Sequence, residues 1–368
     1  SYLHDFLSGN LESPFLNRVE NKECPGYEEV QKLFFEKVMD KSSFQAYVEK
    51  ALAELAEFLA KTPPNQLERN LMFLTKYVFS ALIDADRTNT RQFEENEQEV
   101  EGPDVRILFR RYYERLMDRL ESFRTENPKE AAIHRLRREM SDRCEIFAKH
   151  SPGIYKLSIP TGGGKTLASF RYAVRHALEH GMERIVYVVP YTTIIEQNAA
   201  ELRRIINDDE HLLEYHSNVV DDFGEEDDEY LEGRISVRQK LKLAKDNWDV
   251  PIVMTTLVQF LNVFYAHGSR NIRKMHNLSK SVIIFDEVQK VPIHCVALFN
   301  LALNFLKTYA GSSIVLCTAT QPALDYVEQK LELNEGAEMI GRLDDIEKVF
   351  KRVEILDRTT DGPMSTDQ

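Results

Sequence analysis

Hydrophobic residues recur at helical spacing through the first 150 residues, and no convincing strand pattern interrupts them. The clearest stripe runs over residues 44–59, with apolar side chains three or four positions apart. Ser42 precedes the stripe as the first residue of a capping-box pattern, and Pro63-Pro64 ends it. The same spacing predicts two further helices, at about 66–86 and 105–124.

After residue 150 the pattern changes to short β-branched runs, separated by longer amphipathic stretches. The runs are Ile154–Ile159, Arg184–Val189, Pro251–Met254, Ser281–Phe285 and Ser312–Leu316. Strands that alternate with helices predict a parallel sheet covered by helices on both faces. We therefore expect an all-helical part followed by an α/β domain.

The strongest chemical signal is the run Pro160–Thr166 (PTGGGKT), between the predicted strand KLSI and a helix that Gly181 ends. A phosphate-binding loop requires this context, because its glycines let backbone N–H groups turn toward phosphates at a helix N-terminus. Lys165 is predicted to reach the β- and γ-phosphates and Thr166 to bind magnesium. The alternative, a chance glycine-rich turn, does not account for the context. The other predicted nucleotide contacts in the loop are Thr161, Gly162, Gly163 and Gly164.

A second signal is the pair Asp286-Glu287, which directly follows the apolar run VIIF. Ligands of α/β sheets bind at the carboxyl ends of the strands, where these two side chains are expected. Asp286 is predicted to hold magnesium, and Glu287 to orient and deprotonate the water that attacks the γ-phosphate. Alone, such a pair also fits a surface turn, but here it follows a phosphate-binding loop with several strands between.

Three further sets of polar residues lie at predicted strand ends. They are Tyr191 and Thr192; Thr255, Thr256 and Gln259; and Thr318 and Thr320, the last two within LCTAT. Hydroxyls and amides in such places suit contacts with the phosphates of a nucleic acid, and the LCTAT set is predicted to link the nucleotide site to that groove. They equally suit helix caps.

Composition adds little to the function but limits the class of protein. The 368 residues suggest two to three domains, and no apolar run approaches the ~18–20 residues of a membrane span. The four cysteines, Cys24, Cys144, Cys295 and Cys317, form no CxxC pair, so we expect reduced thiols and a cytoplasmic protein. The net charge of −13 neither supports nor excludes binding to nucleic acid.

Six motifs in order resemble those of the CRISPR-associated helicase-nucleases of type I systems, most closely the type I-C branch. They are PTGGGKTLAS, RIVYVVPYTTIIEQNA, the pair His216-Ser217, NWDVPIVMTTLVQF, RKMHNLSKSVIIFDEVQ and LCTATQPAL. Gln289 ends the DEVQ motif, where many relatives have DEAD or DEAH. We add Arg137, upstream of the glycine-rich loop, to the candidate nucleotide contacts.

The resemblance implies an order of domains. Residues 1–130 would be the C-terminal part of an all-α HD-type nuclease domain, 131–345 the first RecA-like helicase domain, and 346–368 a linker toward a second RecA-like domain. Asp86 matches an aspartate that binds a divalent transition metal in the HD domain, and Asp84 is the less favoured choice. His4-Asp5 is read as a chance dipeptide. We expect the second RecA-like domain to be missing and the isolated chain to be weak or inactive.

The resemblance also implies a function: an ATP-dependent translocase that moves along single-stranded DNA and degrades it in antiviral defence. Its cofactors would be ATP and Mg²⁺, and its partner a CRISPR RNA-guided surveillance complex. Two alternatives stay open at this point. One is another superfamily 2 nucleic-acid motor, and the other is a nucleotide-binding scaffold without turnover.

Overall fold

The computed structural model describes residues 25–95, 102–123, 128–216, 246–266, 268–318, 324, 327–341, 346 and 349–350. Contacts within the chain divide it into two units, Ser1–Thr75 and Lys76–Gln368. The division falls inside one long helix, α5 (Leu67–Glu95). The domain boundary that we expect after residue 130 is not tested by this division and stays a prediction.

The described part of the first unit is helical. It contains α3 (Tyr27–Lys37), α4 (Lys41–Lys61), the 3₁₀ turn η1 (Pro64–Gln66) and the beginning of α5. The apolar stripe predicted over residues 44–59 lies in α4. The double proline ends this helix as expected: Thr62 has extended backbone, and Pro64 starts the next turn.

The cap of α4 differs from our prediction. Asp40, not Ser42, is the N-cap, and its carboxylate accepts hydrogen bonds from the backbone N–H groups of Ser42 and Ser43, both at 3.0 Å. The two serine hydroxyls also donate to this carboxylate. Both residue types are good caps, and the aspartate lies two positions earlier, so the helix begins before the predicted capping box.

The second unit is built on a six-stranded parallel sheet with the strand order β1-β6-β5-β2-β4-β3. Its strands are β1 (Ile154–Ser158), β2 (Arg184–Val189), β3 (Leu212–Tyr215), β4 (Ile252–Thr256), β5 (Ser281–Phe285) and β6 (Ser313–Thr318). The five predicted strands are confirmed, with shifts at some ends. Strand β3 was not predicted, because its four residues are too few to show a period.

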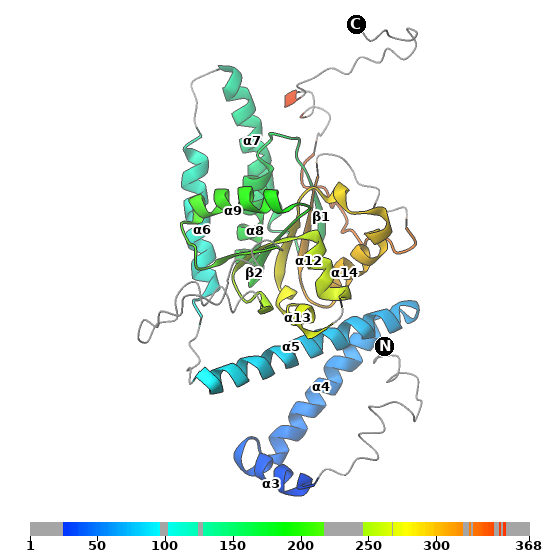
Figure 1. Ribbon diagram of the computed structural model, residues 1–368. Coiled ribbons are helices and arrows are strands. Elements are labelled where there is room, and N and C mark those ends of the chain that lie inside the picture. Colours follow the sequence, from blue (N-terminus) through cyan, green and yellow to red (C-terminus); the bar gives the residue numbers. More distant parts are fainter. Residues whose placement is uncertain are drawn as a thin grey trace, which may run out of the picture. The chain divides into compact units, whose positions relative to one another are not determined.

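Helices cover both faces of the sheet, as predicted (Figure 1). The chain moves across the sheet in one direction through α8 (Lys165–His180) and α9 (Thr192–Ile206). It returns through α12 (Leu257–Tyr265) and α14 (Val296–Thr308). Because crossovers between parallel strands are right-handed, reversing direction places the second pair on the opposite face.

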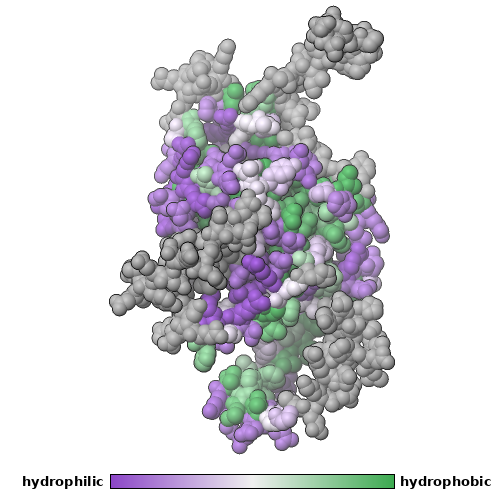
Figure 2. Space-filling view, viewed as in Figure 1, coloured by the Kyte–Doolittle hydropathy of each residue, from purple (hydrophilic) through white to green (hydrophobic). Residues whose placement is uncertain are grey.

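Two more helices lie outside α8 and α9 in the second unit. Helix α6 (Val105–Glu121) contacts α8 and α9, and α7 (Pro128–Phe147) contacts α8. The buried residues of α6 are Leu108, Phe109, Tyr112 and Leu116, which confirms the helix predicted over 105–124. Figure 2 shows hydrophilic residues gathered over the side of the molecule where α6 and α9 lie.

From Lys76 onward, α5 belongs to the second unit, and one face of it is polar. The Lys76 amine donates to the Phe264 carbonyl at the end of α12. Further along this face, Ser80 bonds the ring of His276 at 2.9 Å, and Asp84 pairs with Arg273 at 2.5 Å. Their partners lie near α13 (Ser269–Ile272) and η2 (His276–Leu278), which precede β5. This polar face, spaced by four residues, attaches α5 to the α/β core.

No helix within the described ranges is both long and apolar enough to cross a membrane. Cys144, Cys295 and Cys317 carry free thiols, whereas Cys24 lies outside the described residues. The cytoplasmic location stays a prediction.

Candidate nucleotide-binding site

The phosphate-binding loop leaves the end of β1 and enters α8 at Lys165. Gly162 and Gly164 have φ angles of 82° and 83°, in the left-handed region that favours glycine. Gly163 is crowded instead: a Cβ atom there would lie 2.6 Å from a methyl group of Ile159 and 2.9 Å from the Pro160 carbonyl oxygen. At each of the three glycines, a residue with a Cβ atom would be strained or would clash.

The Lys165 ammonium lies between the two predicted carboxylates. It is 2.9 Å from an oxygen of Asp286 and donates a shorter bond to Glu287. Burial alone would lower the pKa of Lys165, but the two carboxylates outweigh it and raise that pKa above its ordinary value. Burial would likewise raise the pKa of Glu287, but the bond from Lys165 lowers it. Both side chains are therefore charged at neutral pH.

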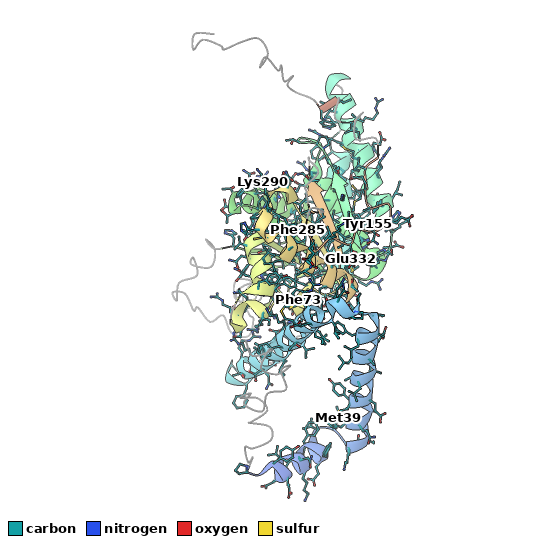
Figure 3. All side chains as sticks on the ribbon, turned by 90° about the vertical axis from the view of Figure 1, so that its right-hand side faces the viewer. Met39, Phe73, Tyr155, Phe285, Lys290 and Glu332 are labelled. Carbon is teal, nitrogen blue, oxygen red and sulfur yellow. The ribbon has the colours of Figure 1, made fainter. Side chains whose placement is uncertain are left out.

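The backbone fixes the direction of these two carboxylates. The Asp286 N–H donates to the Val188 carbonyl of β2 at 2.9 Å, so the chain stays in register one residue beyond β5. Glu287 then turns sharply, with a φ angle of 52°. A non-glycine residue in this region is strained, and such strain is often found at functional sites. Figure 3 labels Phe285 and Lys290, which flank this part of the chain.

Thr318 and Gln289 extend the cluster toward β6. The Thr318 hydroxyl donates to the Gln289 side-chain oxygen at 2.9 Å, and the Gln289 amide donates to Glu287. Lys165, Glu287, Gln289 and Thr318 thus form one continuous hydrogen-bonded row. The strand order explains it, because β6 lies between β1 and β5. Thr320 lies outside the described residues.

A cavity of about 810 Å³ opens beside the loop. Gly162, Gly163, Gly164 and Thr166 line one end of it, and residues of α6, α7, α8 and α9 line most of the rest. Met117 and Leu120 of α6 and Phe123 just after it form an apolar wall, whereas α7 supplies Arg135, Arg137 and Arg138. A cavity with a glycine loop, an apolar wall and several guanidinium groups suits an anionic ligand with a flat apolar part.

Arg137 lies at this cavity, as predicted, but it also holds the loop. Its guanidinium donates two hydrogen bonds to the Gly162 carbonyl oxygen, at 2.9 and 2.6 Å. Arg171 of α8 is buried at the cavity wall and pairs with Asp142 of α7 at 2.7 Å. The loop and its helix are therefore tied to α7 on two sides. Thr161 is exposed and is not among the residues that line the cavity.

The α6 wall was not foreseen from the sequence. Met117 and Leu120 belong to an ordinary amphipathic helix, Phe123 follows its end, and none of the three is part of a motif. Their proximity to the loop results from the packing of α6 on α8. Residues 106–143, which span most of α6 and α7, contain more Lys and Arg than Asp and Glu, but this pattern is more typical of an exposed, salt-bridged helix.

The predicted nucleic-acid contacts lie at the same edge of the sheet. Tyr191, which is 55% exposed, and Thr192 follow β2, whereas Thr255 and Thr256 end the adjacent strand β4 and Gln259 lies in α12. Thr256 caps α12 by accepting a bond from the Gln259 N–H at 3.2 Å. Thr255 is buried and donates to the Tyr215 carbonyl. Tyr191 is therefore accessible to a ligand, while both threonines at the end of β4 have structural partners.

The predicted HD metal site has little support among the described residues. No group of three or more His, Cys, Asp or Glu side chains that could hold a metal ion occurs there. Asp86 is exposed on α5. Asp84 instead bonds Arg273, His276 and Asn247. His4 and Asp5 lie outside the described residues, so the HD site stays a prediction.

The family model of DEAD/DEAH box helicases matches residues 130–327, which include the glycine loop, Asp286-Glu287 and Thr318. The chain belongs to the DEAD/DEAH box helicase family. Most of this helicase region is the α/β fold described above, and Arg137 falls within it. The parallel-sheet, P-loop fold predicted from the sequence is thereby confirmed.

Known proteins similar to the chain include the CRISPR-associated nuclease/helicase Cas3 of Haloferax volcanii. The two are 27% identical over 285 residues, which cover 72% of this chain and 30% of that protein. The resemblance to CRISPR-associated helicases is thus confirmed, while the type I-C branch stays a prediction. The chain spans about 30% of the length of this curated relative.

Two solved structures are also similar. T. fusca Cas3 bound to AMPPNP has 20% identity and a TM-score of 0.39, covering 49% of this chain and 20% of that one. The Sulfolobus solfataricus SWI2/SNF2 ATPase core in complex with dsDNA has 16% identity and a TM-score of 0.33, covering 58% of this chain and 37% of that one.

Proposed function

We propose that this chain supplies the ATP-binding lobe of a CRISPR-associated nucleic-acid motor. The observation that carries the proposal is the contact of Lys165 with Asp286 and Glu287 beside an 810 Å³ cavity that ends at the glycine loop. The loop N–H groups and Lys165 bind the phosphates, and the cavity between α6 and α7 accepts the nucleoside. The phosphates replace the carboxylates as partners of Lys165.

The residues present also fit a magnesium ion. Thr166 and Asp286 would hold it, since Mg²⁺ prefers oxygen ligands and keeps several waters. When bound, the ion neutralises charge on the phosphates. Glu287, which is partly exposed and charged, accepts the proton of the attacking water. Gln289 and Thr318 hold Glu287 in place and connect it to β6.

The wider function extends this proposal. The similarity to a protein named nuclease/helicase supports a motor that translocates along single-stranded DNA and degrades it with an HD nuclease. Asp86 would bind the transition metal there, with ligands from elsewhere in the protein. Tyr191, Thr192, Thr256 and Gln259 would contact the DNA. A CRISPR RNA-guided surveillance complex and a second RecA-like domain are the proposed partners.

Calorimetry with Mg-ATP tests the proposed site. We expect Lys165→Ala to weaken binding about 10- to 100-fold, because a charge-assisted hydrogen bond to phosphate is worth ~1.5–3 kcal/mol. Lys149→Ala, an exposed lysine between α7 and β1, is the matched control and should bind like the wild type. Equal affinities for the wild type and Lys165→Ala would refute the assignment of the loop.

A further inference from the structure

Strand β1, which delivers the glycine loop, is at the edge of the sheet. Its outer side is covered by the segment 334–341, which follows β6 in the chain. Lys156 in the middle of β1 donates its N–H to the Ala337 carbonyl at 2.8 Å and accepts the Met339 N–H at 2.9 Å. The segment therefore pairs with β1 through backbone bonds at the middle of the strand.

Two side chains of the segment complete this pairing, one at each end of β1. At the amino end, the Asn334 side-chain oxygen accepts the Ile154 N–H at 3.0 Å. At the carboxyl end, the Glu338 carboxylate accepts the Ser158 N–H at 3.2 Å and the Ser158 hydroxyl at 2.7 Å. It also accepts the Ile340 N–H at 3.0 Å, so three bonds fix the carboxylate itself.

Ser158 is the last residue of β1, and the glycine loop starts two residues later. The intervening Ile159 is fully buried and closely approaches Gly163. A bond that sets the backbone of Ser158 therefore also sets the point from which the loop turns. Without Glu338, the Ser158 N–H would lose its partner at the free edge of the sheet.

We propose that Glu338 is a positioning residue of the nucleotide site, which acts through Ser158 to hold the glycine loop in its phosphate-binding shape. The role assigned to the loop rests on the proposed function. Glu338 contacts the strand end and leaves the phosphates to the loop. A loop held in place beforehand binds phosphates more tightly, because less conformational freedom is lost on binding.

Asn334 and Glu338 provide a matched pair for the test. Both accept a backbone N–H of β1 from the same segment, but only Glu338 lies at the end next to the loop. We expect Glu338→Ala to weaken Mg-ATP binding about tenfold, or ~1.4 kcal/mol, in calorimetry. Asn334→Ala should lower the free energy of unfolding in urea about as much as Glu338→Ala does. Its affinity for Mg-ATP should nevertheless stay within about twofold of the wild type. Glu338→Gln still offers an acceptor oxygen and should stay within about threefold of the wild type.

A second measurement does not depend on nucleotide. Amide hydrogen exchange of residues 162–164 should be faster in Glu338→Ala and in Ser158→Ala than in the wild type, and unchanged in Asn334→Ala. If Glu338 acts through Ser158, the variant that combines Glu338→Ala with Ser158→Ala should bind Mg-ATP no more weakly than Glu338→Ala alone. Ser158→Ala removes only a hydroxyl, so it keeps the test available if Glu338→Ala does not fold.

The inference is overturned if Glu338→Ala binds Mg-ATP like the wild type, or if Asn334→Ala weakens binding equally. Exchange at 162–164 that is the same in all variants would also overturn it. These outcomes differ from a failure of the proposed function, in which the wild type and Lys165→Ala would bind Mg-ATP equally. In that case the exchange experiment still decides whether Glu338 orders the loop.

Discussion

His176 shows how a single buried side chain is set by its partners. It lies on α8, has no exposed surface, and stacks on Tyr172 with ring centres 5.0 Å apart. One ring nitrogen is 2.8 Å from the Ala148 carbonyl, which can only accept, so this nitrogen carries the hydrogen. The other nitrogen then accepts from the Ser313 hydroxyl at 2.6 Å. The neutral ring satisfies both partners, and a second proton would place a charge on a ring without exposed surface and reverse the direction of the bond to Ser313.

The pH dependence of stability follows from this environment. Burial, together with the nearby His180 and His150, lowers the pKa of His176 to about 4 although the Ala148 bond opposes it. An unfolded histidine titrates near 6.5, so the unfolded state binds the proton first as the pH falls. The neutral His176 ring therefore contributes on the order of 3 kcal/mol to the free energy of unfolding above pH 6.5. This contribution is lost as the pH falls from about 6.5 to 4.

We predict that His176→Gln flattens the dependence of the unfolding free energy on pH between about 4 and 6.5, as measured by urea denaturation. Gln can donate to the Ala148 carbonyl and accept from Ser313 without titrating. His134→Gln is a suitable control, because that ring is partly exposed at the cavity. A slope in His176→Gln equal to that of the wild type would contradict this assignment.

Helix α5 shows how one element can carry two faces with different roles. Asp84 is largely buried and belongs to the polar face that attaches α5 to the α/β core. Burial would raise the pKa of Asp84, but hydrogen bonds from His276, Arg273 and Asn247 lower it to about 2. Asp86, two positions on, projects from a different side of the helix and is exposed. The structure thus separates two aspartates that look alike in the sequence.

These two aspartates give opposite predictions for stability. Asp84→Asn should lower the unfolding free energy at pH 7 by about 2–4 kcal/mol, because it removes the nearer of two carboxylate partners of the buried Arg273 and leaves only Asp246, at 3.8 Å. Asp86→Asn should change it by less than about 0.5 kcal/mol. Denaturation in urea measures both. A loss in Asp86→Asn as large as that in Asp84→Asn would show that Asp86 has a partner of its own.

On the scale of the whole molecule, the order of strands assembles the proposed nucleotide site. The loop follows β1, the two carboxylates follow β5, and Thr318 ends β6, which lies between them. These three strands are side by side although β1 is far from β5 and β6 in the sequence. All their carboxyl ends point to one edge, where α/β sheets bind ligands. The same arrangement serves a motor and a nucleotide-binding scaffold, and only turnover separates the two.

Glu287→Gln distinguishes the motor from the scaffold in the full-length natural protein. We predict that DNA-stimulated ATP hydrolysis falls about 10²- to 10⁴-fold, the usual contribution of a general base. Mg-ATP affinity should change by less than about threefold, because Lys165 and the loop remain. Glu335→Gln, an exposed glutamate outside the cavity, is the control. Hydrolysis that is absent from the wild type as well would favour the scaffold.

The sequence by itself determined most of the local elements and pointed to the candidate reacting groups. Glycines with left-handed backbone, a strand before them and a helix after them are short-range requirements, and they are visible within ten residues of Lys165. The alternation of apolar runs likewise predicted five of the six strands. The sequence did not decide between two nearby residues that could each cap the same helix. Asp40 is the N-cap of α4 because it lies upstream of the equally suitable Ser42.

Tertiary structure alone decided which distant residues meet. Periodicity records whether a residue is buried, but it does not record its neighbour. Nothing in the sequence near Asp84 identifies Arg273 as its partner, and nothing near Glu338 points to Ser158. The apolar wall of the cavity has the same origin, since Leu120 reaches the loop only through the packing of α6 on α8. Such contacts depend on strand order and helix packing, which the whole chain determines together.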